Sequence, residues 1–155
     1  MSFQEGLKIA GSALSAQRLR MNTISNNLAN AQTTRTVNGG PYKRQEVYFE
    51  PRFHNHLLER VRASQTHGGH LPFEEPSNHG GVVASGIQED QSPGREVYEP
   101  NHPDANEEGY VMYPNINVVQ EMTNMMSSSR SYEASVTAFE SMKAMALKAL
   151  EIGRA

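Results

Sequence analysis

Apolar side chains recur at heptad spacing near the C-terminus and predict a long helix. From Asn117 to about Ile152 the segment lacks proline and glycine and is rich in Ala, Met, Glu and Lys, which favour helices. Asn117 is suited to cap its start, Gln120 adds the spacing of a capping box, and Gly153 stands where a left-handed C-cap would end it. The seam of this helix comprises Val118, Met122, Met125, Ser129, Tyr132, Val136, Phe139, Lys143, Ala146 and Leu150.

A second long helix is predicted from Ser2 to about Asn30. Its seam repeats every seven residues, which favours left-handed supercoiling against a partner helix. The seam comprises Phe3, Leu7, Ala10, Leu14, Gln17, Met21, Ile24 and Leu28. Two interpretations remain open: the terminal helices pair only with each other, or they pair and also present surfaces to neighbouring subunits.

The length of the C-terminal helix bears on its stability. About 35 residues span roughly 50 Å, which exceeds what the core of so small a protein needs. The apolar seams offer limited burial against the entropy cost of ordering two long helices. We therefore expect the helices to be stable only when packed among others, and the isolated monomer to be partly disordered at both ends.

The segment between the helices predicts short strands and loops. The turn signal Ser92-Pro93-Gly94 separates two strand-like runs. Residues 54–81 are polar and rich in Gly and Pro, so we expect an extended or mobile loop with a short helix near residues 57–63. The strand-like runs are the second half of residues 42–49, and residues 82–89, 95–99 and 109–113.

The predicted fold class is therefore mainly α with a small β-rich middle. The two long terminal helices are paired as an α-helical coiled coil, with short strands and a long loop between them. We expect an N-terminal helix in residues 1–32, a middle domain in residues 33–113 and a C-terminal helix in residues 114–155.

Composition excludes several classes of protein. The chain has 155 residues, a net charge of -3, 37% hydrophobic residues and no cysteine, and its mean hydropathy is -0.63. It therefore has no disulfide or thiolate metal site and no electrostatic reason to bind nucleic acid. It contains no apolar run of the roughly 18 residues that a membrane span needs, and its N-terminus lacks the features of a cleaved signal peptide.

No residue pattern indicates catalysis, a cofactor or a small-molecule substrate. Phosphate-binding glycine loops and nucleophile motifs are missing, and the carboxylates of residues 89–108 match exposed loop positions. The histidine spacing fits no named zinc motif, so we expect no metal site. The six histidines are His54, His56, His67, His70, His79 and His102.

One motif carries a family resemblance. Ser25-Asn26-Asn27-Leu28-Ala29-Asn30-Ala31, which closes the N-terminal heptad helix, resembles the signature of the bacterial flagellar axial proteins that build rod and hook. The proximal-rod members of that family are the most similar. Further matching stretches are Gly40-Pro41-Tyr42-Lys43-Arg44, Asp90 to Pro100, His102-Pro103-Asp104-Ala105-Asn106, Gly109-Tyr110-Val111, Pro114-Asn115-Ile116-Asn117, Glu121-Met122, Ser129 to Ala134, and Ile152-Gly153. Residues 54–81 depart from the family pattern.

The resemblance implies a structural subunit of the rod in the flagellar basal body. Such proteins pass through the flagellar export apparatus largely unfolded, without a cleaved signal, and build a helical tube that transmits torque across the periplasm for motility. The implied partners are other copies of the chain and other flagellar rod proteins. The alternative is a soluble coiled-coil adaptor that binds one partner helix without polymerising.

Two groups of residues are candidates for function. Residues of the helix-packing or subunit interface are Leu7, Leu14, Met21, Ile24, Leu28, Met122, Met125, Tyr132, Val136, Phe139 and Leu150. Residues of the family motif are Asn26, Asn27, Leu28, Asn30, Pro114, Asn117, Arg130, Tyr132 and Glu133. The asparagines either cap the helix locally or bond across subunits. Arg130 and Glu133 either pair with each other or pair across an interface.

Overall fold

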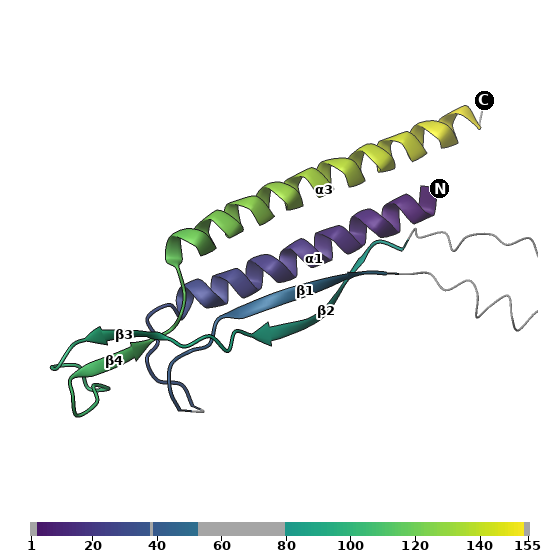
Figure 1. Cartoon of the computed structure of the whole chain (residues 1–155). Coiled ribbons are helices and arrows are strands. Elements are labelled where there is room, and N and C mark those ends of the chain that lie inside the picture. The colour runs from purple at the N-terminus through teal and green to yellow at the C-terminus, as the bar shows by residue number, and fades with distance from the viewer. Residues whose placement is uncertain (1–2, 38, 53–79, 154–155) are drawn as a thin grey trace, which may run out of the picture.

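The computed structural model describes residues 3–37, 39–52 and 80–153. The elements in chain order are α1 (Phe3–Ala29), β1 (Gln45–Pro51), β2 (Val82–Glu89), β3 (Arg95–Tyr98), β4 (Tyr110–Tyr113) and α3 (Val118–Ile152). Figure 1 shows α3 lying along α1, and α1 lying on the ribbon formed by β1 and β2. Strands β3 and β4 form a separate hairpin at the end of the molecule away from both termini. The prediction of two long terminal helices with a small β-containing middle is confirmed.

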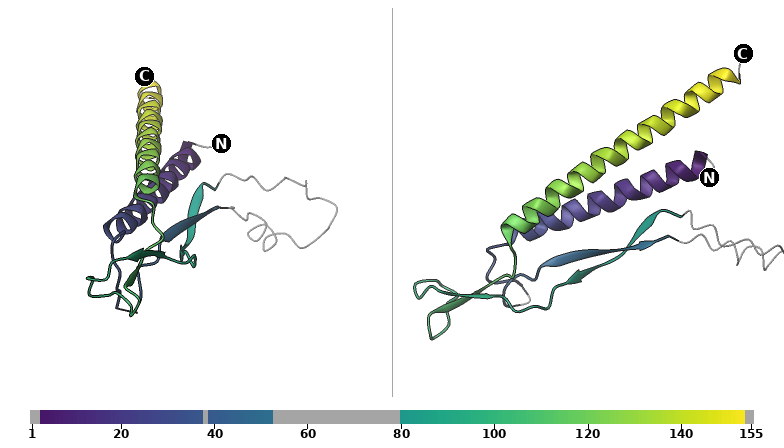
Figure 2. Two further views of the ribbon diagram at one scale, coloured as in Figure 1. Left: turned by 60° about the vertical axis from the view of Figure 1, so that its left-hand side comes forward. Right: turned by 45° about the horizontal axis from the view of Figure 1, so that its top comes forward.

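Helices α1 and α3 run antiparallel, and their axes diverge toward the termini (Figure 2). Asn27 bonds to Glu121 near the start of α3, and Gly6 lies against Met142 near the other end of the pair. The last turns of α3, which include Leu150, therefore extend past the start of α1. Neither helix is both long and apolar enough to cross a membrane.

The face that α3 turns toward α1 is offset from the predicted seam. Six of the ten predicted positions are half-buried: Met125, Ser129, Tyr132, Val136, Phe139 and Ala146. Met122 is 52% exposed and Leu150 is 67% exposed, so the single chain does not bury them within the helix pair. Small side chains at Ser128 and Ser135 take the place of larger apolar ones. The buried or half-buried positions of α3 are Glu121, Asn124, Met125, Ser128, Ser129, Tyr132, Ser135, Val136, Phe139, Met142 and Ala146.

The ends of α3 agree only in part with the predicted caps. The Asn117 side chain accepts hydrogen bonds from the backbone N–H groups of Val119 and Gln120, at 3.1 and 3.2 Å, as an N-cap does. The capping box is wrong, because the Gln120 amide donates to Asn124 at 3.5 Å. Gly153 has a φ of -76°, so the helix ends without the predicted left-handed residue.

Strands β1 and β2 form an antiparallel ribbon against the opposite side of α1. The ribbon carries an irregularity between Tyr48 and Phe49. Ser12 anchors it, because its hydroxyl accepts from the N–H of Val82 at 3.1 Å and donates to the Ile9 carbonyl at 2.7 Å. Arg20 of α1 lies over the Phe49 ring, 5.6 Å from its centre. One face of α1 thus packs on α3 and another on the ribbon.

Strands β3 and β4 pair with each other and not with β1 or β2. The turn at residues 92–94 lies between β2 and β3, which the structure assigns to separate ribbons, so it closes no hairpin. Gly109 starts the return strand with a φ of 82°, a conformation that side chains disfavour. A Cβ at this position would also lie 2.9 Å from the Tyr98 ring.

Several predictions concern residues that the structure does not describe. They include the short helix near residues 57–63, most of the loop of residues 54–81, and five of the histidines: His54, His56, His67, His70 and His79. The division into domains at residues 32 and 113 stays a prediction.

Gln17 provides a test of the helix pair. Its side-chain oxygen is buried and has no hydrogen-bond partner among the described residues. A buried acceptor without a partner costs on the order of 1–3 kcal/mol. We expect Gln17→Met to raise the free energy of unfolding of the purified chain by about 1 kcal/mol, measured by urea titration followed by circular dichroism.

The control is Gln4→Met, which makes the same change at an exposed position of α1. It should leave the unfolding midpoint nearly unchanged. Equal shifts for both variants would contradict the assignment of the cost to the buried oxygen.

Candidate functional site

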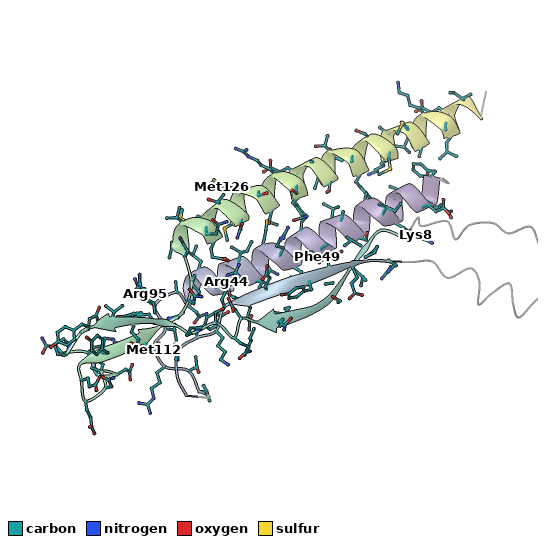
Figure 3. The ribbon with its side chains drawn as sticks, in the orientation of Figure 1. Lys8, Arg44, Phe49, Arg95, Met112 and Met126 are labelled. Carbon is teal, nitrogen blue, oxygen red and sulfur yellow. The ribbon has the colours of Figure 1, made fainter. Side chains whose placement is uncertain are left out.

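A carboxylate and an amide are enclosed where α1 ends and α3 begins. Glu121, in the first turn of α3, and Asn27, near the end of α1, each have 1% of their surface exposed. Arg44 reaches this point from the segment that leads into β1 (Figure 3). Buried polar groups destabilise a fold unless they find partners. We call Asn27, Tyr42, Arg44, Gln45 and Glu121 the polar junction.

The side-chain amide of Asn27 uses its full hydrogen-bonding capacity. Its nitrogen donates to the Gln45 carbonyl at 2.8 Å and to Glu121 Oε2 at 3.2 Å. Its oxygen accepts from the Gln45 N–H at 2.8 Å and from the Tyr42 hydroxyl at 3.1 Å. An amide has two donors and two acceptor lone pairs, so all four of these sites are occupied. Asn27 therefore joins α1 to β1 and to α3.

Arg44 neutralises the buried carboxylate. Its Nε and Nη2 atoms lie 3.0 and 2.9 Å from Glu121 Oε1, and the Glu121 side chain is only 2% exposed. Burial lowers the pKa of the guanidinium, but the hydrogen bond and the charge of Glu121, with help from Glu46 and Asp90, raise it overall. The position of Glu121 in the first turn of α3 adds the favourable field of the helix N-terminus.

Tyr42 contributes a neutral donor to the polar junction. Burial raises the pKa of its hydroxyl, and the negative charges of Glu89 and Glu121 raise it further. The phenol therefore stays protonated and keeps donating to Asn27 at physiological pH.

The other asparagines of the motif have local roles in the single chain. Asn30 donates from its side chain to the Asn26 carbonyl at 2.9 Å and accepts from the Thr33 hydroxyl at 3.1 Å. These bonds cap the end of α1 and start the following turn. The Asn26 side chain is exposed, so a role for it across subunits stays a prediction.

The predicted interface residues fall into three groups in the single chain. Ile24 is buried, whereas Met122 and Leu150 are exposed. The remaining eight are half-buried: Leu7, Leu14, Met21, Leu28, Met125, Tyr132, Val136 and Phe139. Their role between subunits stays a prediction.

The rest of the family-motif set is dispersed along the C-terminal part of the chain. Pro114 is buried just before α3, and Asn117 caps that helix. Arg130 and Glu133 are both exposed, and no ion pair joins them. Glu133 accepts instead from the Ser129 hydroxyl at 3.5 Å.

His102 belongs to a loop network. Its Nδ1 accepts from the N–H of Asp104 at 3.1 Å, and the Asp104 carboxylate accepts from the Thr34 hydroxyl at 2.8 Å. Arg35 lies 3.8 Å from the same carboxylate. In the described part of the chain, no three metal-ligating side chains come together.

Sequence reasoning did not identify the polar junction as a unit. Tyr42, Arg44 and Glu121 were placed only in matching family stretches, and Asn27 was expected to cap or to bond across subunits. The available signal was an acidic residue in the first turn of one helix and an asparagine in the last turns of the other. The third residue of the ion-pair network, Arg44, lies in a loop. The heptad pattern of the helices does not predict where that loop lies.

Two family models match the ends of the chain. The model described as flagella basal body rod protein matches residues 7–35. The model described as flagellar basal body rod FlgEFG protein C-terminal matches residues 107–152. The first match contains Asn27 and the second contains Glu121, so each covers one helical part of the polar junction.

Curated relatives match the chain over nearly its whole length. The flagellar basal-body rod protein FlgC of Bacillus subtilis is 44% identical and covers 99% of this chain and 100% of its own. FlgC of Borreliella burgdorferi is 41% identical, with 98% of each chain covered. FlgC of Salmonella typhimurium is 38% identical, with 94% of each covered.

Removing the charge of Glu121 tests the polar junction. Glu121→Gln removes the buried partner of Arg44 and leaves Glu46, whose carboxylate lies 3.5 Å away and is 53% exposed. Breaking a buried ion pair in this way costs about 3–5 kcal/mol. We expect a loss of unfolding free energy of that order in urea titrations.

The matched control is Glu133→Gln, an exposed carboxylate on the same helix, for which we expect a change within about 0.5 kcal/mol. If the two variants were equally stable, the polar junction would not hold the helices and β1 together.

Proposed function

This chain belongs to the FlgC family of flagellar basal-body rod proteins and is a structural subunit of that rod, not an enzyme, and from this premise we propose that α1 and α3 form the surface through which neighbouring subunits pack. Its flagellar location is the basal body. The remainder of the proposal concerns how the subunit assembles and what the assembly does.

The exposed apolar residues of α3 carry this proposal. Among the described elements, α3 packs only against α1, and its other faces retain large apolar side chains. Contiguous exposed apolar surface is typical of protein interaction sites. The exposed apolar residues are Val118, Val119, Met122, Met126, Met145, Leu147, Leu150 and Ile152; Met126 is labelled in Figure 3.

In the proposed assembly, α1 and α3 supercoil as a left-handed coiled coil, as their heptads favour. Exposed residues such as Met122 and Leu150 then become buried against helices of other subunits. The partners are other copies of this chain and other rod proteins. Repeated along the rod within the periplasm, these contacts transmit torque.

The stability that we expect for the single chain also bears on its export. A chain whose helices gain much of their burial from neighbours has low stability on its own. Such a chain is suited to passage through the export apparatus in an unfolded form, without a cleaved signal, and to folding where it joins the rod.

Met122→Asp separates assembly from folding. Met122 is exposed in the single chain, so the purified variant should keep its unfolding free energy within about 0.5 kcal/mol. In cells, the new carboxylate would be buried between subunits, which is strongly unfavourable. We expect loss of swimming and of rods in isolated basal bodies.

The control is Thr123→Asp, at the neighbouring exposed position, which carries no large apolar side chain and should swim normally. Normal swimming of Met122→Asp would contradict a subunit contact through Met122.

Circular dichroism of the dilute chain tests the expected instability of the ends. We expect less helix than the full lengths of α1 and α3 together would give, because the ends of both helices lack their neighbours. Helix content equal to two complete helices would contradict the expectation.

A further inference from the structure

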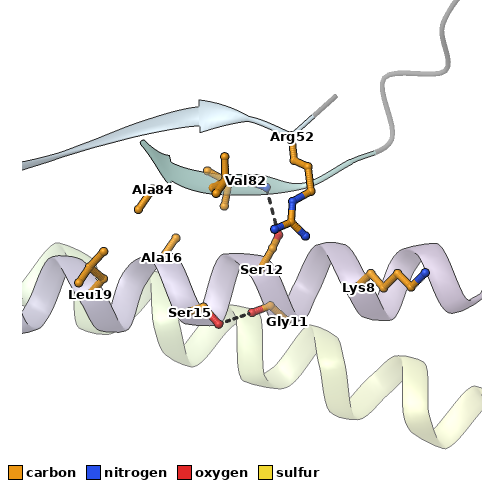
Figure 4. Close-up of a pocket in the computed structure, with 10 residues that line it drawn as sticks. Lys8, Gly11, Ser12, Ser15, Ala16, Leu19, Arg52, Val82 and Ala84 are labelled. Carbon is orange, nitrogen blue, oxygen red and sulfur yellow. Dashed lines mark hydrogen bonds between the residues drawn. The ribbon is translucent and has the colours of Figure 1, made fainter. Parts of the chain in front are cut away.

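A groove of about 390 Å³ runs between α1 and β2. Ser12 and Ala16 of α1 face Val82 and Ala84 of β2 across it (Figure 4), and its lining also includes Gly11, Ser15 and Val83. The Ser12 hydroxyl accepts a hydrogen bond from the N–H of Val82 at 3.1 Å, which joins the two walls of the groove at this point. The opening is therefore held by the fold itself.

Two cations border this groove. Lys8 and Arg52 belong to its lining, which includes no acidic residue. Neither side chain has an ion-pair partner in the part of the chain that the structure describes. The groove thus combines an apolar strip with two positive charges that have no ion-pair partner among the described residues.

The β3–β4 hairpin presents a surface of the opposite character. The pairing of Tyr98 with Tyr110 and of Glu96 with Met112 places these four side chains on one face, which we call the hairpin face. The two rings meet edge to face, with centres 5.3 Å apart. The apolar members are exposed, by 63% for Tyr98, 43% for Tyr110 and 37% for Met112.

The region around the hairpin is strongly acidic. Residues 90–113 contain one basic residue other than histidine, Arg95. Against it stand six carboxylates: Asp90, Glu96, Glu99, Asp104, Glu107 and Glu108. An aromatic surface within this acidic region is complementary to an apolar groove bordered by Lys8 and Arg52, and both cations are also suited to pack on tyrosine rings.

We propose that the hairpin face of one copy of this chain docks into the α1–β2 groove of a second copy. Lys8 and Met112 lie at opposite ends of the molecule (Figure 3), so a single chain cannot bring its own two surfaces together. A contact between two different surfaces of identical chains is head-to-tail and extends an open assembly unless its rotation closes a ring. This inference rests on the proposed function and adds a second contact to that of the helices.

Disulfide trapping tests the contact directly, because the chain has no cysteine of its own. Cells would carry two differently tagged copies, one with Ser15→Cys in the groove and one with Tyr98→Cys on the hairpin face. Basal bodies would be isolated, oxidised and separated on a non-reducing gel. We expect a band of twice the chain mass that carries both tags and disappears on reduction.

The matched control replaces Tyr98→Cys by Arg95→Cys, on the opposite face of the same strand, and should give no such band. Two outcomes would overturn the inference and leave the rod function intact. In the first, both tagged chains are present in the basal bodies but form no disulfide-linked dimer. In the second, the control pair gives as much dimer as the test pair. A product with a different protein would also overturn it. Absence of a tagged wild-type chain from basal bodies would instead contradict the rod function.

If the cysteine variants do not assemble, exchanging the charges of Lys8 and Glu96 tests the same contact. Lys8→Glu and Glu96→Lys should each reduce swimming, because each brings like charges together in the contact. The two changes in one chain restore opposite charges and should restore swimming. A double variant no better than either single variant would overturn the inference.

Discussion

The ion pair between Arg44 and Glu121, completed by Asn27, is the interaction on which the arrangement of the chain depends. The three residues come from the start of the ribbon, the start of α3 and the end of α1. Helix–helix contacts alone allow one heptad stripe to slide along another. A buried carboxylate has far fewer acceptable positions, because moving it leaves a charge without a partner. The polar junction therefore fixes where α3 lies along α1.

This constraint explains why a small chain can leave much of the apolar surface of α3 exposed. With the helices held in place at one end, their pairing tolerates small side chains, and serines at positions 128 and 135 lie on the inner face of α3 among larger apolar residues. Other large apolar residues, such as Met126 and Leu147, lie on the outer faces. Apolar surface that would stabilise an ordinary monomer is available for assembly instead.

Much of this fold follows from local sequence, whereas the contacts between distant segments do not. Propensity and hydrophobic periodicity placed both helices, and alternating residues between turns placed the strands to within a few residues. The predicted seam of α3 contains Met122, whereas the residue that faces inward is its neighbour Glu121. The prediction was displaced by one residue there because it chose apolar side chains. Only the approach of Arg44 from a distant loop makes the glutamate the inner residue. The same limit applies to the strands, since the turn at residues 92–94 does not reveal that β2 pairs with β1.

The burial of the Glu121 carboxylate also makes the joint insensitive to ionic strength. Dissolved ions weaken attraction between exposed charges over distances of about 10 Å at 0.1 M salt, but they act much less on a buried pair. With 2% of the Glu121 side chain exposed, counterions have little access to it. The angle between helix and ribbon should therefore stay the same in dilute and in saline surroundings, whereas contacts through surface cations such as Lys8 would loosen as salt rises.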